Sequence, residues 1–123
     1  MAQGKLGYPL EGLKVLDFTR VLAGPFASRM LSDLGADVVK VEPPEGDNTR
    51  LWGKITAGIS GYFNMANAGK RNISIDLRAE GAQELVLALA SKADVVIENA
   101  SDLKALRRSV ERVWRELTTQ AGD

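Results

Sequence analysis

Residues 13–42 read LKVLDFTRVLAGPFASRMLSDLGADVVKVE, and this stretch decides the fold. Its two ends, 13–18 and 37–42, are short apolar runs rich in strand-forming residues. Between them, Gly24-Pro25 marks the entry into a helix, because proline is well placed in a first helical turn, and Gly35 marks its end. The order strand, helix, strand with short connections predicts two parallel strands joined by a crossover helix.

Inside this helix the large apolar residues recur on one face, the spacing that is typical of an amphipathic helix. They are Phe26, Met30, Leu31 and Leu34. Downstream, residues 72–77 alternate polar and apolar as a half-buried strand does, 80–92 have helical spacing, and 93–98 repeat the strand pattern. Residues 45–61 are rich in glycine without a sustained period, so we expect a long excursion outside the sheet.

The last segment, 102–117, predicts an amphipathic helix. Its apolar positions recur at steps of three and four residues, and they are Leu103, Leu106, Val110, Val113 and Leu117. The composition changes at about residue 100, where the chain becomes rich in arginine. We therefore expect two parts, 1–99 and 100–123, the second being a divergent C-terminal helix and tail.

Composition excludes several classes of function. The 123 residues, 45% of them hydrophobic, suffice for one domain with a real core. Lys plus Arg and Asp plus Glu number 16 each, so no global positive field favours nucleic acid or an acidic membrane. The absence of Cys and His removes thiol nucleophiles, imidazole bases and the common zinc ligand sets. No apolar run suits a signal peptide or a membrane span, so we expect a cytoplasmic protein without a metal.

Candidate ligand groups follow the predicted strands. The loop 19–24 leads into a helix whose positive end favours phosphate, although its single glycine is also the mark of a plain tight turn. Glu42 ends the second strand, where it would either hold a ribose hydroxyl or be a solvated carboxylate. Lys70, Arg71 and Arg78 flank the third strand as either phosphate partners or ordinary surface charges.

The aspartates are the remaining candidates for nucleophilic chemistry. They are Asp17, Asp33, Asp37, Asp47, Asp76 and Asp94. None is singled out by a neighbouring basic residue together with a glycine-rich loop, so the pattern alone assigns no catalytic residue.

Three blocks in the right order carry a resemblance to a known family. They are LDFTRVLAGPFASRMLSDLGADVVKVEPPEGDNTR at 16–50, YFNMANAGKRNISIDL at 62–77 and ADVVIEN at 93–99. The chain thereby resembles the N-terminal segment of class III CoA-transferases, of the formyl-CoA and L-carnitine type. The resemblance implies an α/β, Rossmann-like three-layer fold with a mostly parallel sheet, truncated to the N-terminal half of a CoA-transferase and followed by the C-terminal helix.

The resemblance also implies where CoA is contacted. It carries these contacts onto the first loop, the end of the third strand and the end of the fourth, at Leu22, Ala23, Ile75, Asp76, Leu77, Arg78, Asn99 and Ala100. Arg78 would be the phosphate partner. Parallel strands place these three segments at one edge of the sheet, which agrees with the pattern. CoA or acyl-CoA would be a substrate, with no permanently bound cofactor.

The family moves CoA between two carboxylic acids through a mixed anhydride on a catalytic aspartate, which lies downstream of the ADVVIEN block. We therefore expect the chain to resemble a transferase but to be inactive alone. Two alternatives stay open: a non-catalytic module that binds CoA, a nucleotide or another protein, and a fragment of a relative of the 2-methylacyl-CoA racemases. A homodimer and an association with a chain supplying the missing half are both consistent with the sequence.

Overall fold

The computed structural model describes residues 7–98 together with Glu111 and Arg115, both of which are helical. The predicted helix 102–117 and the boundary at residue 100 otherwise lie outside the described residues. Within them, four strands form a central sheet in the order β5-β2-β1-β6, and every neighbouring pair is parallel. These strands are β1 (Lys14–Asp17), β2 (Asp37–Glu42), β5 (Arg71–Ser74) and β6 (Val95–Ile97).

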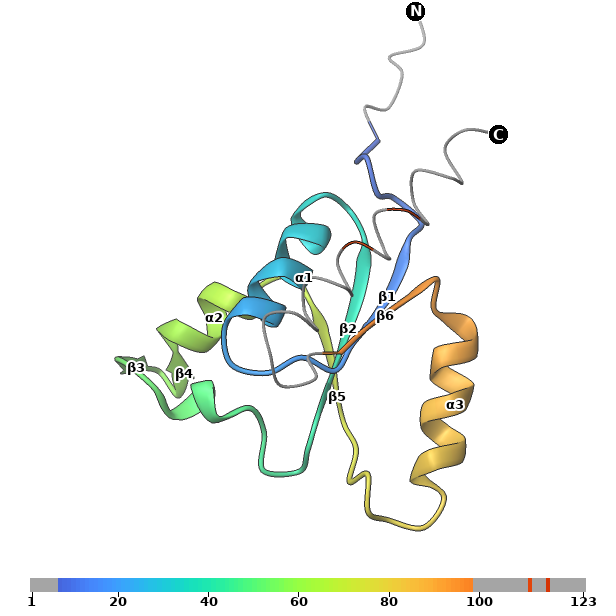
Figure 1. Ribbon diagram of the computed structural model, residues 1–123. Helices are drawn as coiled ribbons and strands as arrows, with labels where there is room; N and C mark the ends of the chain where they lie inside the picture. The colour runs from blue at the N-terminus through green and yellow to red at the C-terminus, as the bar shows by residue number, and fades with distance from the viewer. Residues whose placement is uncertain (1–6, 99–110, 112–114, 116–123) are drawn as a thin grey trace, which may run out of the picture.

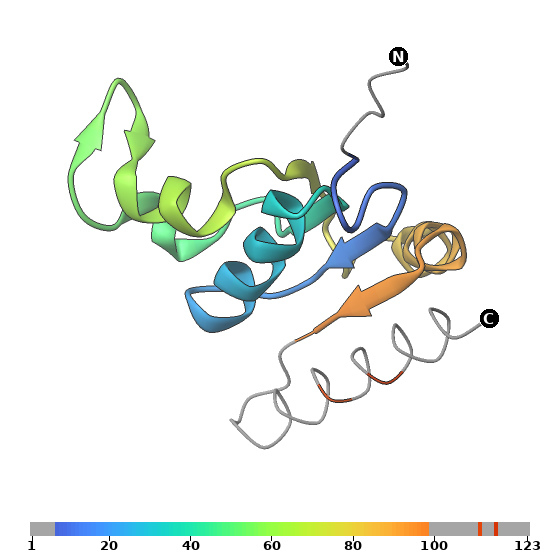
Figure 2. The same cartoon turned by 90° about the horizontal axis from the view of Figure 1, so that it is seen from above.

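Helices lie on both faces of this sheet (Figures 1 and 2). α1 (Ala23–Asp33) and α2 (Gly61–Asn67) lie on one side, and α3 (Ala82–Lys92) lies on the other. Successive strand residues point to opposite faces, so Val15 enters the core beneath α1 whereas Leu16 enters the core beneath α3. The predicted α/β three-layer architecture with a parallel sheet is thereby confirmed.

The buried face of α1 differs from the predicted one. Phe26, Met30 and Leu34 are 46%, 53% and 44% exposed, and only Leu31 of the predicted set packs against the core. The helix instead buries Gly24, Pro25 and Ser28. A Cβ at Gly24 would lie 2.4 Å from Thr19 Cβ, so small residues allow a close approach that large apolar ones would prevent.

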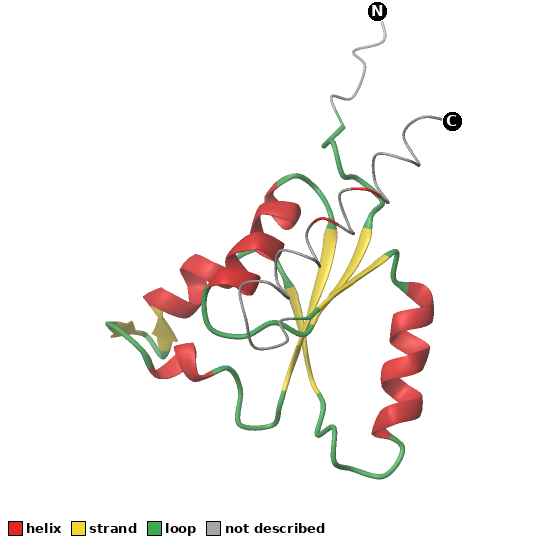
Figure 3. Ribbon diagram, viewed as in Figure 1, coloured by secondary structure: helices red, strands yellow, loops and turns green. Residues whose placement is uncertain are grey.

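The excursion after β2 stays outside the central sheet, as its glycine content predicts (Figure 3). It forms a 3-10 helix, η1 (Asn48–Leu51), and a separate two-stranded hairpin of β3 (Ile55–Thr56) and β4 (Ile59–Ser60). The sequence reading did not anticipate α2, which follows directly. Ser60 caps this helix by accepting a hydrogen bond from the Phe63 N–H.

Candidate functional site

A groove lies at the edge of the sheet where the strands end. Its volume is about 720 Å³, and it is lined by residues of β2, β6 and α3 and of the segments that follow the four strands. The rim is formed by Arg20 after β1, Glu45 after β2, 76–78 after β5 and Glu98 after β6, above an apolar floor of Phe18, Val41, Ile75, Val86, Ala90 and Val96. The carboxyl edge of a parallel sheet is where α/β proteins bind their ligands, so this groove is the candidate site.

The segment that follows β5 supplies four of the predicted contacts, and the structure places all four in this groove. Ile75 is only 6% exposed and belongs to the core beneath α3, so its role is structural. Leu77 is 59% exposed, and the Arg78 side chain is 83% exposed. Leu77 and Arg78 are therefore the residues of this segment that a ligand can reach most easily.

Asp76 binds both the backbone and the guanidinium of Arg78. Its Oδ1 accepts hydrogen bonds from the Arg78 backbone N–H at 3.0 Å and from Arg78 Nε at 3.1 Å. These bonds lower the pKa of Asp76 and raise the pKa of Arg78, so both groups are charged at neutral pH. Among the described residues only Nε of this guanidinium is hydrogen-bonded, so its terminal nitrogens are available for a second anion.

The loop between β1 and α1 holds two further predicted contacts. Leu22 is the N-cap of α1 and Ala23 its first residue, and no side chain caps this helix end. Both are exposed, but they do not line the groove, to which this loop contributes Arg20 instead. The last two predicted contacts, Asn99 and Ala100, lie outside the described residues, directly after Glu98.

Glu42 is neither a solvated carboxylate nor free to hold a ribose. It is 3% exposed, and Arg50 binds it through Nε at 2.8 Å and Nη2 at 2.7 Å. The Asp47 N–H and the Asn72 side chain also donate to it. Burial acts to raise the pKa of Glu42, but the bonds from Arg50 and Asp47 more than offset it, so the pKa is lowered overall.

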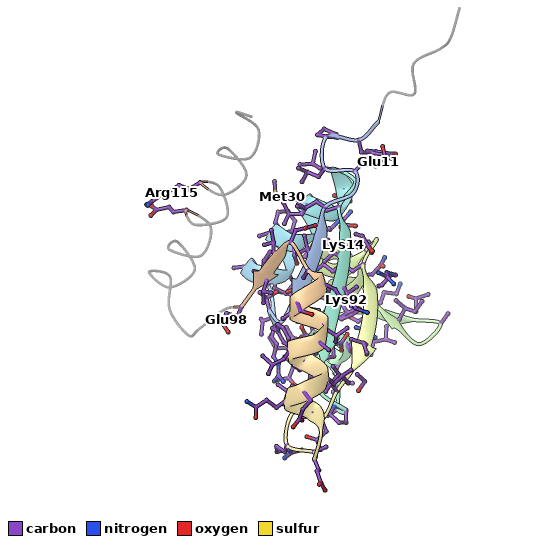
Figure 4. All side chains as sticks on the ribbon, turned by 90° about the vertical axis from the view of Figure 1, so that its right-hand side faces the viewer. Glu11, Lys14, Met30, Lys92, Glu98 and Arg115 are labelled. Carbon is purple, nitrogen blue, oxygen red and sulfur yellow. The ribbon has the colours of Figure 1, made fainter. Side chains whose placement is uncertain are left out.

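Neither Lys70 nor Arg71 lines the larger groove. Lys70 is buried and donates to Asp17, Asn67 and the Pro25 carbonyl. Its burial lowers its pKa, although the charge of Asp17 acts against this. Arg71 opens β5 and pairs with Asp37 at the amino edge, beside a smaller groove of about 230 Å³ that Lys14 and Lys92 also line (Figure 4). Neither residue can reach a ligand in the larger groove.

The candidate aspartates are all engaged within the chain. Ion pairs with Lys or Arg hold Asp17, Asp33, Asp37, Asp47 and Asp76. Asp94 accepts the Lys14 N–H. Across residues 7–98, Glu111 and Arg115, no cluster of Asp, Glu, His or Cys has the size to hold a metal ion. No helix in that same part is long and apolar enough to cross a membrane.

Sequence reasoning missed two features of the site. Arg20 lines the groove: the loop 19–24 that contains it was predicted as a candidate for phosphate binding, but this side chain was not singled out in it. The second feature is a buried ion pair between Lys40 and Asp47, with Nζ 3.1 Å from Oδ2. Its signal was a lysine inside the apolar run VVKVE, because a buried lysine requires a charged or hydrogen-bonding partner.

Comparisons with known proteins identify relatives of the chain. A family model described as CoA-transferase family III matches residues 10–113. An acetyl-CoA:oxalate CoA-transferase of Acetobacter aceti is 46% identical over 74% of this chain and 24% of its own length. A human succinyl-CoA:glutarate CoA-transferase is 47% identical over 74% of this chain and 21% of its own.

A solved structure shows the same fold. A CAIB/BAIF family protein from Brucella suis matches with a TM-score of 0.71 and 46% identity, covering 83% of this chain and 31% of that one. The chain thus spans about a quarter of the length of the curated relatives it matches.

Proposed function

Because the chain belongs to CoA-transferase family III, we propose that it supplies the CoA-binding part of such an enzyme. The groove at the carboxyl edge of the sheet would hold the nucleotide end of CoA. The observation that carries the proposal is the exposed guanidinium of Arg78 beside an apolar floor.

The chemistry of the groove suits this ligand. CoA ends in a flat adenine, a ribose phosphate and a pyrophosphate. The apolar floor offers contact area to a base, and the rim offers two arginines, Arg20 and Arg78. Arginine binds phosphate oxygens with paired hydrogen bonds and stays charged at every physiological pH. Leu77 would contact the base or ribose, and Leu22 with Ala23 would contact the pyrophosphate arm at the start of α1.

The family reaction would require more than the described residues. Transfer of CoA through an aspartyl anhydride needs a carboxylate that is free to attack the acyl thioester. The six aspartates discussed above are held by ion pairs or by a backbone N–H. We therefore expect this chain to bind CoA or acyl-CoA and to transfer it only together with the remaining part of the family's length.

A second candidate is an interaction module without catalysis. The observation that favours it is the exposed apolar stripe of Phe26, Met30 and Leu34 on α1, a surface suited to another protein. This role is compatible with CoA binding, since the stripe is not part of the groove lining. No feature of the described residues favours a racemase.

Calorimetric titration of the 123-residue chain with CoA, beside 3′-dephospho-CoA, tests the proposal. We expect saturable CoA binding that weakens without the 3′-phosphate. Arg78→Ala should reduce CoA affinity at least about tenfold, because a charge-assisted hydrogen bond is lost. Arg71→Ala is the matched control: it removes an arginine from the same strand segment, also paired with an aspartate, but at the opposite edge. No saturable binding, or equal losses in both variants, would refute a specific CoA site.

A further inference from the structure

Val21 has an unusual backbone. Its φ is +72°, in the left-handed region that β-branched residues rarely enter. Such a residue persists only where its surroundings hold it, and strained residues of this kind cluster at ligand sites. Val21 lies in the loop between β1 and α1, one residue after Arg20 of the groove. Whatever holds Val21 therefore decides where the arginine before it and the helix start after it lie.

The residue that holds it comes from the excursion after β2. Asp47 Oδ2 accepts a hydrogen bond from the Val21 N–H at 3.2 Å. Its other oxygen accepts from the Thr49 N–H at 3.0 Å and from Thr49 Oγ1 at 2.8 Å. Asp47 is only 2% exposed. Thr49, two residues further along the chain, thus fixes the orientation of the Asp47 carboxylate that binds the Val21 N–H.

Lys40 makes a second tie to the same loop. Its Nζ lies 3.1 Å from Asp47 Oδ2 and donates to the Thr19 carbonyl at 2.8 Å. Both side chains of the pair are 1% exposed. Thr19 and Val21 are therefore both tied down, and Arg20 lies between them. The ammonium also neutralises Asp47, which would otherwise repel an anion at the start of α1.

We propose that Asp47 is a positioning residue of the groove: by binding the Val21 N–H it holds the strained turn that directs Arg20 to the rim and presents Leu22 and Ala23 at the start of α1. The identity of the ligand rests on the function proposed above. The loop-holding role is independent of it.

The loop-holding role is tested without ligand. Amide hydrogen exchange measured by NMR should be at least about tenfold slower at Val21 than at Arg20 and Leu22, because only the Val21 N–H is bonded to a buried group. Val21→Gly should shift the urea midpoint of unfolding upward, since glycine enters the left-handed region freely. Exchange at Val21 as fast as at its neighbours, or a lowered midpoint in Val21→Gly, would overturn the role.

The positioning role is tested by calorimetric titration with CoA. Asp47→Asn should weaken CoA binding about tenfold, the equivalent of one lost hydrogen bond. Adding Val21→Gly should restore at least half of this loss on a logarithmic scale, because a glycine adopts the turn without being held. Because Val21→Gly also stabilises the fold, the affinities are compared at a temperature at which circular dichroism shows every variant fully folded, which excludes a general loss of stability as the cause. If Asp47→Asn does not fold, Val21→Pro, which removes the N–H and the left-handed φ together, should give the same loss of affinity.

The two failures are distinguishable. A wild-type chain that does not bind CoA refutes the proposed function, while hydrogen exchange and the urea midpoint still decide whether Asp47 holds the loop. If the wild-type chain binds CoA and the folded Asp47→Asn or Val21→Pro variant binds it with the same affinity, the positioning role alone is refuted.

Discussion

Lys70 Nζ lies 3.1 Å from Asp17 Oδ2, and both side chains are almost completely buried. The pair connects the carboxyl end of β1 to the residue preceding β5, and the same ammonium donates to the Pro25 carbonyl of α1 and to Asn67 Oδ1 of α2. Asp17 also accepts from Thr19 and Ser28. One buried cation therefore joins the first strand to both helices on that face of the sheet.

Removing this cation should be costly. Lys70→Met leaves the Asp17 carboxylate buried without its counter-ion, and we expect a loss of about 3–5 kcal/mol in the free energy of unfolding. Arg71→Ala, which breaks an exposed pair with Asp37, should lose less than about 1 kcal/mol. Urea denaturation followed by circular dichroism measures both. Equal losses in the two variants would contradict the central role of the buried pair.

Acid should destabilise the fold through Glu42. The net pKa of this buried carboxyl is below its ordinary value of 4.5, so the native state favours the ionised form more than the unfolded chain does. Its contribution is fully present above about pH 4.5 and is lost as the pH falls through the lower native value. Urea midpoints measured between pH 6 and pH 3 should therefore fall, and fall less steeply in Glu42→Gln.

Asp76→Asn is the control for this titration. Its pKa is lowered as well, by the bonds from Arg78, but the group is exposed to water. The slope of stability against pH should therefore stay close to that of the wild type. A slope that is unchanged in Glu42→Gln would show that other carboxylates govern acid unfolding.

The sheet could be predicted because β1, β2 and β6 are local runs of apolar residues whose pattern needs no knowledge of the rest of the chain. The buried face of α1 could not be predicted, because the spacing of large apolar residues does not show how closely the helix approaches the sheet. Gly24 and Ser28 allow that approach, and Phe26 and Met30 are left outside. α2 was missed because GYFNMAN carries a glycine and two asparagines, and its stability comes from the Ser60 cap and from packing on α1.

The predicted contact residues could be assigned to the carboxyl edge of the sheet because parallel strands all end there. The hydrogen bonds and ion pairs that hold the surrounding loops were not predictable. Asp47 meets Val21 across 26 residues and Lys70 meets Asp17 across 53. Such pairs leave no local periodicity, so neither the burial of Glu42 nor the occupation of the aspartates follows from the sequence alone.

Substitutions at two glycines with positive φ distinguish the cost of a left-handed backbone from the cost of a steric clash. At Gly35, φ is +103° and an added Cβ would lie 2.2 Å from Tyr8 Cβ, whereas at Gly58 φ is +77° and nothing lies within 4 Å. Gly58→Ala should cost about 1 kcal/mol, the penalty for a left-handed alanine. Gly35→Ala should cost at least about 2 kcal/mol more, because Tyr8 must also move. Similar urea midpoints would show that Tyr8 shifts easily.

The exposed stripe on α1 makes a last prediction about the fold. Met30→Lys should change the free energy of unfolding by less than about 0.5 kcal/mol, since the side chain is 53% exposed. Val38→Ala, at a position 1% exposed in the core beneath α1, should cost roughly 2 kcal/mol as the comparison. Size-exclusion chromatography of Met30→Lys tests the same surface for association. A large loss of stability in Met30→Lys would mean that this face of α1 is covered in solution. The cover would be another part of the chain if the wild type elutes as a monomer, and a second copy of the chain if the wild type elutes as a dimer.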